Sequence, residues 1–499
     1  MALLEVDNLG VSFVTRNGIN RAVDGVSFTV EAGKITAIIG ESGSGKSVAC
    51  YSLLGLVPCP PGRIDSGTAL FEGKDLLQLP EDKLRSIRGR DIAMVFQDPM
   101  TCLNPYMTVG KQLMEPLLLH GKATRSQARA RAIELMSEVG LRDPEITIDH
   151  YPHQFSGGMR QRIMIAMALI NEPKLLIADE PTTALDVTIQ AQILELLAEL
   201  QTKRDVGIIF ISHDLAVVSD IADTIVVMQE GKVVERGERD DIFLRASHPY
   251  TQKLLAAIPS SDNSGEDSDG EALLEVRDLT VRFAQRGSDS VTAVDNVSFE
   301  VRRGEILGLV GESGSGKSTI GRAVLQLQHA QQGSVHFDGT DLGKLTKNEL
   351  KAMRRRMQII FQDPFASLNP RMTVFDTLAE PLLLHGIATR RDITPKVLAL
   401  MDDVGLARSQ VRKYPHEFSG GQRQRIAIGR ALATRPEFVV ADEPVSALDV
   451  SVQAAVINLL LEIQQVFGSS MIFIAHDLSV VRYFSDDIAV MYLGQIVEV

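Results

Sequence analysis

The sequence has no tryptophan and only three cysteines among its 499 residues. Cys50, Cys59 and Cys102 are odd in number and lack the CxxC spacing of zinc and redox sites, so no cysteine-based metal centre is expected. A second copy of the surrounding pattern, introduced below, has Gly321 in place of Cys50 and Ser367 in place of Cys102. The cysteines are therefore predicted to be small packing residues.

An excess of positive charge and long apolar runs are also missing. With 51 basic and 64 acidic side chains the formal net charge is −13, which gives no attraction to phosphate backbones and disfavours general nucleic-acid binding. No run approaches the ~18 apolar residues that cross a bilayer, and the first residues lack the basic and apolar regions of a signal peptide. The chain is expected to stay in the cytosol.

The sequence is long enough for more than one domain. Single hydrophobic cores stop growing near ~250–300 residues, so a chain of 499 residues predicts at least two. Its hydrophobic share of 44% and charged share of 23% are close to the averages for globular proteins and predict compact folding.

One pattern of motifs occurs twice along the chain. The repeated motifs are GESGSGKS at 40–47 and 311–318, FSGG at 155–158 and 418–421, ADEP at 178–181 and 441–444, and HDL at 213–215 and 476–478. The last three keep the same spacing in both copies, so no net insertion separates them. We therefore predict two copies of one structural unit.

The segment between the copies, 259–271, is polar, acidic and almost free of apolar residues, which is typical of a flexible linker. One domain is accordingly predicted over residues 1–258 and a second over 272–499. The second copy stops earlier in the pattern than the first, so its C-terminal segment looks incomplete. We expect the natural chain to continue with a segment like 240–258.

Short runs of β-branched residues, such as 34–39 and 174–178, alternate with helical stretches such as 188–201. Such short, mostly apolar runs predict strands buried on both faces. Their alternation with helices predicts an α/β fold with a mainly parallel sheet and helices on both sides.

Each copy has a glycine-rich segment, G-x-x-x-x-G-K-S, between a predicted strand and a predicted helix. The glycines of this pattern let backbone N–H groups converge on phosphate oxygens at a helix N-terminus, while the lysine reaches the β- and γ-phosphates and the serine ligates Mg²⁺. The predicted residues are Gly40, Glu41, Ser42, Gly43, Ser44, Gly45, Lys46 and Ser47 in the first copy, and Gly311, Glu312, Ser313, Gly314, Ser315, Gly316, Lys317 and Ser318 in the second. Two matches in equivalent contexts favour ATP binding with Mg²⁺ over a chance match.

An acidic pair follows a buried strand in each copy, Asp179 with Glu180 and Asp442 with Glu443. Open α/β sheets bind ligands at the carboxyl ends of their strands. Alone, such a pair is more often a solvated strand end. Combined with a phosphate loop, the aspartate is predicted to hold Mg²⁺ and the glutamate to polarise the attacking water.

A histidine, His213 or His476, follows the next buried strand of each copy. A neutral imidazole at this place could hydrogen-bond the γ-phosphate or the attacking water. A lone histidine is usually structural, but its recurrence after the acidic pair favours a catalytic role.

A Ser-Gly-Gly segment opens an apolar helix in each copy. The free N–H groups and hydroxyl of such a helix start can bind an anion, although without context the segment could be only a flexible cap. The residues are Ser156, Gly157, Gly158 and Met159 in the first copy, and Ser419, Gly420, Gly421 and Gln422 in the second.

These motifs, in this order, resemble those of the ATP-binding-cassette ATPases over nearly the whole chain. The resemblance implies two tandem P-loop domains, each with a RecA-like, mainly parallel sheet, an antiparallel β subdomain and a helical subdomain. It implies adenine stacking for Phe13 and Phe283, although half-buried aromatics on strands are common. It also implies that Gln97 and Gln362 sense Mg²⁺.

Members of this family close two cassettes face to face. The resemblance therefore implies two crossed sites, each joining the phosphate loop and acidic pair of one copy to the Ser-Gly-Gly signature of the other. Loops 184–186 and 447–449 would contact the partner copy. Because the serine and both glycines remain, Met159 is not expected to prevent hydrolysis.

Finer features, QDPMTCLNP at 97–105, QDPFASLNP at 362–370 and HPYT at 248–251, are similar to those of oligopeptide, dipeptide and nickel importers. A fused pair resembles the ATPases of bacterial glutathione and peptide-antibiotic importers. The resemblance implies a peripheral ATPase on the cytoplasmic face of the inner membrane, with two permease subunits and, through them, an extracytoplasmic solute-binding protein. The lack of a C-terminal cysteine cluster predicts no iron–sulfur cluster.

Three other classes fit the motifs less well. Tandem cassettes that act on ribosomes carry a long, charged, helical linker, whereas this linker is short and acidic. DNA-repair ATPases of the superfamily need zinc-bearing insertions, which three cysteines cannot supply. A sugar importer with one degenerate cassette conflicts with the intact lysine and glutamate of both copies.

Overall fold

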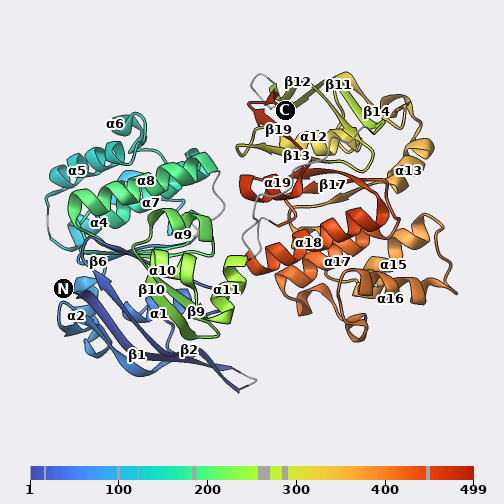
Figure 1. Ribbon diagram of the computed structural model, residues 1–499. Coiled ribbons are helices and arrows are strands. Elements are labelled where there is room, and N and C mark those ends of the chain that lie inside the picture. The colour runs from blue at the N-terminus through green and yellow to red at the C-terminus, as the bar shows by residue number, and fades with distance from the viewer. Residues whose placement is uncertain are drawn as a thin grey trace. The chain divides into compact units, whose positions relative to one another are not determined.

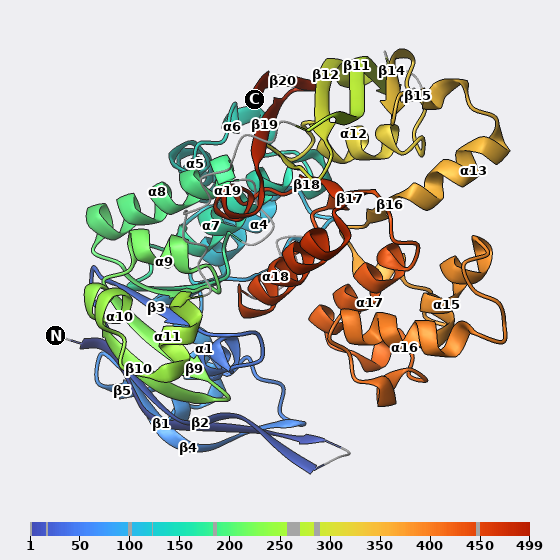
Figure 2. The same ribbon diagram turned by 45° about the vertical axis from the view of Figure 1, so that its right-hand side comes forward.

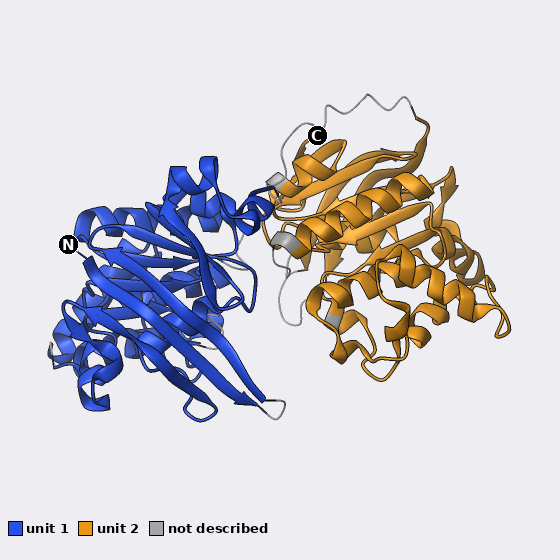
Figure 3. Cartoon of the chain, turned by 60° about the horizontal axis from the view of Figure 1, so that its bottom comes forward, with its two compact units in different colours: residues 1–258 blue, residues 259–499 orange. Residues whose placement is uncertain are grey.

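The computed structural model describes residues 2–15, 18–97, 102–121, 123–182, 187–256, 270–283, 290–445 and 450–499. Contacts within the chain divide it into two compact units, residues 1–258 and 259–499 (Figure 3). Most of the predicted linker, 259–271, lies outside the described residues.

Unit 1 contains strands and helices in alternation after an N-terminal hairpin (Figure 1). Its strands are β1 (Ala2–Thr15), β2 (Gly18–Glu31), β3 (Ile35–Ile39), β4 (Gly62–Phe71), β5 (Lys74–Asp75), β6 (Ile92–Val95), β7 (Leu175–Asp179), β8 (Gly207–Ile211), β9 (Thr224–Gln229) and β10 (Lys232–Glu238). Its helices are α1 (Lys46–Leu53), α2 (Glu81–Ile87), α4 (Val109–Leu119), α5 (Arg125–Glu138), α6 (Pro144–Thr147), α7 (Gly157–Leu169), α8 (Val187–Arg204), α9 (Leu215–Ile221), α10 (Arg239–Arg245) and α11 (Pro249–Ala256), with 3₁₀ turns η1 (Leu76–Gln78) and η2 (Pro152–Gln154).

These strands form two sheets. The larger has the order β10-β9-β3-β8-β7-β6 and is parallel except for the edge pair β9 and β10. The smaller is antiparallel, with the order β2-β1-β4-β5. The predicted mainly parallel sheet is therefore present, beside a separate antiparallel sheet.

The central strands of the larger sheet are buried on both faces, as their mostly apolar sequences predict. Every residue of β3, β7 and β8 is buried. On β3, Ile35, Ala37 and Ile39 belong to a core shared with α4, α5, α7 and α8. Ile38 belongs to a second core, shared with α1 and the antiparallel sheet. The alternation of side chains along a strand thus joins the two layers of unit 1.

Unit 2 repeats this arrangement. Its strands are β11 (Ala272–Phe283), β12 (Val291–Arg302), β13 (Ile306–Gly311), β14 (Gln332–Phe337), β15 (Thr340–Asp341), β16 (Met357–Ile360), β17 (Phe438–Asp442), β18 (Ser470–Ile474), β19 (Asp487–Tyr492) and β20 (Gln495–Glu498). Its helices are α12 (Lys317–Val324), α13 (Lys347–Arg356), α14 (Pro364–Ser367), α15 (Val374–Leu384), α16 (Ile393–Asp403), α17 (Gly420–Leu432), α18 (Val450–Phe467) and α19 (Leu478–Phe484), with 3₁₀ turns η3 (Leu342–Lys344), η4 (Arg408–Gln410) and η5 (Pro415–Glu417). The sheet orders are β16-β17-β18-β13-β19-β20 and β12-β11-β14-β15.

A helical layer completes each unit. In unit 2, helices α15 and α16 pack with α17, and Figures 1 and 2 show α17 alongside α18. In unit 1, α4, α5 and α7 pack in the same way. With the two sheets, this gives the predicted RecA-like, antiparallel and helical parts, and the predicted fold class is confirmed. Among the helices of the described ranges, none is long and apolar enough to cross a membrane.

The packing prediction for the cysteines is correct for one of the three. Cys50 is buried in α1, but Cys59 and Cys102 are exposed. Cys59 lies in the turn before β4 and Cys102 in the connection from β6 to α4. Connections run over the protein surface, which explains why the prediction is wrong for these two.

Candidate nucleotide-binding sites

The phosphate loop of unit 1 connects β3 to α1 and carries a buried lysine. Gly40 has φ of 148°, and a Cβ there would lie 2.1 Å from the carbonyl oxygen of Met228, so the backbone requires glycine. The ammonium of Lys46 donates to the carbonyl oxygens of Gly40 at 2.7 Å and Glu41 at 2.8 Å. The loop therefore places a buried cation beside a helix N-terminus, which suits phosphate oxygens.

Unit 2 has the same loop between β13 and α12. Gly311 also has φ of 148°, with its Cβ position 2.1 Å from the Met491 carbonyl oxygen. Lys317 donates to the carbonyl oxygens of Gly311 at 2.6 Å and Glu312 at 2.9 Å.

The structure brings the serine that follows each lysine to the predicted metal-binding aspartate. Ser47 Oγ donates to Asp179 Oδ1 at 2.8 Å, and Ser318 Oγ donates to Asp442 Oδ1 at 2.7 Å. Both aspartates are almost fully buried, and this burial raises the pKa of each against the opposing effect of the hydrogen bonds. A hydroxyl and a carboxylate in contact form an oxygen donor set that fits Mg²⁺.

The predicted catalytic glutamate of unit 1 meets both the glutamine and the histidine that the sequence assigns to its site. Gln97 Nε2 donates to Glu180 Oε2 at 2.7 Å, and His213 Nδ1 lies 3.2 Å from Glu180 Oε1. The three side chains come from the ends of β6, β7 and β8, which are neighbours in the sheet.

In unit 2 the same three positions come together. Gln362 Nε2 donates to Glu443 Oε2 at 2.7 Å, and His476 Nδ1 lies 3.8 Å from the same oxygen. Contact with Glu443 raises the pKa of His476, and contact with His476 lowers the pKa of Glu443.

Both glutamates have a left-handed backbone. The φ angles are 48° at Glu180 and 47° at Glu443, a region that non-glycine residues rarely adopt. Each backbone N–H is held by the adjacent strand, donating to Ile211 O and Ile474 O at 2.9 Å. Strained backbone that the surrounding sheet maintains is typical of functional positions.

The Ser-Gly-Gly segments cap their helices differently in the two units. Ser156 Oγ accepts from the Met159 N–H at 3.4 Å at the start of α7. At the start of α17, Ser419 Oγ accepts from the Gln422 N–H at 3.4 Å, and Gln422 Oε1 accepts from the Ser419 N–H at 3.2 Å. The side chain of Met159 has no oxygen to accept a hydrogen bond from the Ser156 N–H. Of these two helix starts, the one in unit 2 therefore has the reciprocal capping box and the one in unit 1 does not.

The second glycine of each segment permits a close helix contact. A Cβ on Gly158 would lie 2.6 Å from Ile189 Cγ2 on α8, and a Cβ on Gly421 would lie 2.2 Å from Val452 Cγ1 on α18. The N-terminus of each signature helix can therefore approach the next helix only with glycine at this position.

The two phenylalanines predicted to stack on adenine take no part in these hydrogen bonds. Phe13 is half-buried on β1, and Phe283 ends β11 with 42% of its surface exposed. Loops 184–186 and 447–449 lie outside the described residues. Adenine stacking and partner contact stay predictions.

Comparisons with known proteins identify the family. The model of the ABC transporter family matches residues 23–183 and 294–446, and the model of the oligopeptide/dipeptide transporter C-terminal region matches 234–286. The chain belongs to the ABC transporter family. It is an ABC ATPase with two cassettes, one in each unit.

Two curated ABC ATPases are similar over the full length. The glutathione import ATP-binding protein of Escherichia coli is 46% identical over 100% of this chain and 86% of its own length. The peptidoglycan transport ATP-binding protein of Agrobacterium fabrum is 47% identical over 99% of this chain and 92% of its own. A solved dimeric bacterial ABC transporter cassette is 28% identical, with a TM-score of 0.43, and covers 47% of this chain and 98% of that one.

Sequence reasoning missed one residue of each ABC site. Tyr51 Oη donates to Asp179 Oδ2 at 2.8 Å, whereas Arg322 of unit 2 places Nη2 3.9 Å from Asp442 Oδ2. Each lies one helical turn after the serine predicted to ligate Mg²⁺, on the same face of the helix. That spacing of four residues was the available signal.

A second missed residue is Tyr250 of the HPYT motif. In the sequence this motif indicated only a similarity to one group of importers, and no role in the site was predicted for Tyr250. Its Oη accepts a hydrogen bond from the backbone N–H of Glu41 in the phosphate loop at 3.1 Å. The region matched by the oligopeptide/dipeptide model therefore contacts the phosphate loop of its own ABC cassette.

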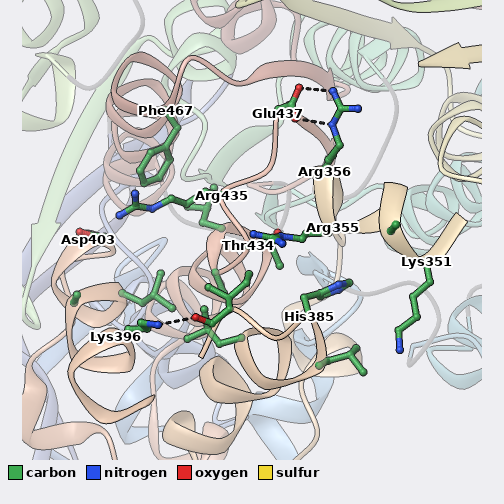
Figure 4. A pocket seen from close by; sticks show the side chains of 18 of the residues that line it. Lys351, Arg355, Arg356, His385, Lys396, Asp403, Thr434, Arg435, Glu437 and Phe467 are labelled. Atoms are coloured by element: carbon green, nitrogen blue, oxygen red, sulfur yellow. Dashed lines mark hydrogen bonds and ion pairs between the residues drawn. The ribbon is translucent and has the colours of Figure 1, made fainter. Parts of the chain in front are cut away.

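Unit 2 of this ABC ATPase also has a pocket of about 990 Å³ that is separate from the predicted nucleotide-site residues (Figure 4). Lys351, Arg355 and Arg435 line it, together with Phe467 and the ion pair of Arg356 with Glu437. None of the predicted nucleotide-site residues contributes to its lining.

Proposed function

We propose that this ABC ATPase is the motor subunit of a bacterial importer for peptides or peptide-like solutes. The observation that carries the ATPase part of the proposal is the contact of glutamine, proposed catalytic glutamate and histidine, which is present in both units. Support for the solute class comes from the oligopeptide/dipeptide region at 234–286 and from the named import and transport functions of the relatives.

At each site the lysine and the loop N–H groups bind the ATP phosphates, and the serine and aspartate hold Mg²⁺. The metal ion supplies charge neutralisation to the transferred phosphoryl group. Glu180 or Glu443 accepts the proton of the attacking water, and Gln97 or Gln362 fixes the orientation of that carboxylate. His213 or His476 hydrogen-bonds the water or the γ-phosphate.

The two sites are crossed between the units. The phosphate loop and acidic pair of unit 1 act with Ser419 to Gln422 of unit 2, and those of unit 2 act with Ser156 to Met159 of unit 1. Support comes from the signature helices, which each present a serine hydroxyl and helix N–H groups suited to an anion. Loops 184–186 and 447–449 contact the opposite unit in this arrangement.

Two permease subunits dock beside the glutamines, and a solute-binding protein delivers the cargo to them. A pocket of about 710 Å³ in unit 2 supports this position, because Gln362 and Asp363 line it together with Glu380 of α15 and Arg430 of α17. Gln362 also bonds the catalytic Glu443, so a helix seated here would act on the chemistry through one side chain. The subunit then sits at the cytoplasmic face of the inner membrane, attached through its permeases.

The test replaces each catalytic glutamate by glutamine. Glu180→Gln and Glu443→Gln should each slow ATP hydrolysis while sparing ATP binding, because loss of a general base costs on the order of 10²-fold or more. Glu172→Gln is the matched control, since Glu172 shares the left-handed backbone but is an exposed surface residue. Full hydrolysis by the assembled transporter with Glu443→Gln would show that the sites are not equivalent.

Purification from native membranes tests the importer assignment. Two polytopic membrane subunits should accompany the chain, and vesicles containing the complex should take up di- or oligopeptides or glutathione in an ATP-dependent manner. Recovery with ribosomes instead would contradict the proposal.

A further inference from the structure

Helix α11 of unit 1 reaches back to the phosphate loop. Tyr250, on this helix, is only 8% exposed, and its hydroxyl oxygen accepts from the Glu41 N–H at 3.1 Å. The hairpin of β9 and β10 holds another part of the loop, because the Gly231 N–H donates to Ser44 O at 3.0 Å. Unit 2 has the hairpin contact too, from Gly494 to Ser315 O at 3.0 Å.

Tyr250 and Lys46 hold opposite sides of a single peptide group. The carbonyl oxygen of Gly40 accepts from Lys46 Nζ, and the N–H of Glu41, which belongs to the same peptide, donates to Tyr250 Oη. A peptide group is planar, so rotation about its axis would break both hydrogen bonds together. The tyrosine hydroxyl therefore fixes the carbonyl that positions the lysine.

The helix that carries Tyr250 is anchored by a charged side chain. Glu235 of β10 accepts from the Ser247 N–H at 2.7 Å, the Ser247 hydroxyl at 2.8 Å and the His248 N–H at 3.2 Å. Burial alone would raise the pKa of Glu235, but the hydrogen bonds that it accepts at the start of α11 lower it to about 2. The carboxylate is thus ionised at physiological pH. His248 Nδ1 also accepts from the Tyr250 N–H at 3.2 Å, which fixes the first turn of α11.

We propose that β10 and α11 brace the phosphate loop of unit 1, and that Tyr250 is a positioning residue for Lys46. The brace sets the affinity of this site for MgATP, so a movement of α11 changes nucleotide binding in unit 1. The inference rests on the proposed function in one respect, namely that Lys46 binds the ATP phosphates.

The experiment measures binding of a fluorescent ATP analogue with Mg²⁺ to one site at a time in the full chain. Lys317→Ala disables the site with the phosphate loop of unit 2, so that only the site of unit 1 binds the analogue. Lys46→Ala disables the site of unit 1, so that only the site of unit 2 binds it. Tyr250→Phe keeps the buried ring and removes only the hydroxyl. Loss of one hydrogen bond should weaken binding about threefold to tenfold in the Lys317→Ala background. Binding in the Lys46→Ala background should not change, so the second site is an internal control.

Hydrogen exchange gives a readout that a general loss of stability would not reproduce. Tyr250→Phe should speed exchange at the Glu41 amide and leave the amides of α11 as protected as in the parent. Glu235→Gln, which keeps the side-chain shape but removes the charge, should weaken binding in the same direction. The KM for ATP should rise in these variants, with kcat unchanged at saturating ATP.

The outcomes separate the two proposals. The brace proposal would be wrong if Tyr250→Phe left the affinity for the ATP analogue unchanged in the Lys317→Ala background. It would also be wrong if Tyr250→Phe lowered the affinity equally in both backgrounds. Parental binding after Lys46→Ala and Lys317→Ala are combined would instead overturn the nucleotide sites themselves.

Discussion

At the scale of single residues, the two proposed nucleotide sites differ in what contacts the second carboxylate oxygen of the aspartate proposed to hold Mg²⁺. Asp179 accepts a hydrogen bond from the neutral hydroxyl of Tyr51, while Asp442 has the guanidinium of Arg322 at 3.9 Å. A guanidinium beside a carboxylate lowers the negative charge that remains for a bound cation. The site with Asp442 should therefore hold Mg²⁺ less tightly than the site with Asp179.

Arg322→Tyr places in unit 2 the residue type that unit 1 has at the equivalent position, Tyr51. We expect it to lower the Mg²⁺ concentration for half-maximal ATP hydrolysis roughly twofold to fivefold, because Arg322 is half exposed and solvent screens its attraction to Asp442. The measurement uses a Glu180→Gln background, in which only the acidic pair of unit 2 supports hydrolysis. Arg322→Lys keeps the charge and should leave the Mg²⁺ dependence as it is. Superimposable curves for the parent and Arg322→Tyr would refute the electrostatic account.

At the scale of secondary structure, the two glycines of each signature have different tasks. A Cβ on Gly157 would meet no heavy atom within 4 Å, whereas a Cβ on Gly158 would lie 2.6 Å from Ile189. The first glycine is therefore available for contact with an anion, and the second is required for packing between α7 and α8. Gly421 has the packing task in unit 2, against Val452.

Gly158→Ala and Gly421→Ala should each destabilise their unit by about 1–3 kcal/mol, because a packed interface must separate to admit the methyl group. Gly157→Ala is the matched control and should leave stability unchanged or slightly raised, since alanine favours the helix. Chemical unfolding of the full chain, followed by circular dichroism, measures the difference. Equal midpoints for Gly157→Ala and Gly158→Ala would contradict the packing explanation.

The same scale shows what could be predicted from sequence. Strands β3, β7 and β8 were predictable because their residues are mostly apolar, and the phosphate loops because glycine spacing dictates their backbone. The bond from Gln97 to Glu180 joins two separately predicted residues, but its geometry depends on a left-handed turn after β7 that no local pattern requires. Tyr250 was hidden for a related reason, since its contact with Glu41 joins segments that only the tertiary fold brings together.

At the scale of the whole molecule, the proposed crossed arrangement predicts which two substitutions, one in each unit, affect the same ATP site. Lys46 and Ser419 belong to one proposed site, and Lys317 and Ser156 to the other. Lys46→Ala with Ser419→Arg should therefore hydrolyse ATP no more slowly than Lys46→Ala alone. Lys46→Ala with Ser156→Arg damages both sites and should lose the remaining activity, because defects at independent sites combine.

ATP turnover by the assembled transporter, compared among the two double and the three single variants, measures this. The opposite ranking of the double variants would place each signature with the phosphate loop of its own unit. Equal expression and equal unfolding midpoints of the two serine variants control for effects on folding.

The left-handed backbone of Glu180 and Glu443 also bears on inheritance. One base change converts a glutamate codon to a glycine codon, and glycine adopts positive φ without the strain that glutamate carries. Such an allele would encode a chain without the proposed catalytic carboxylate but with the backbone strain relieved, and this chain would still occupy its permeases. In a cell that carries both alleles, the inactive chains would compete for transporters, and the defect would be dominant rather than recessive.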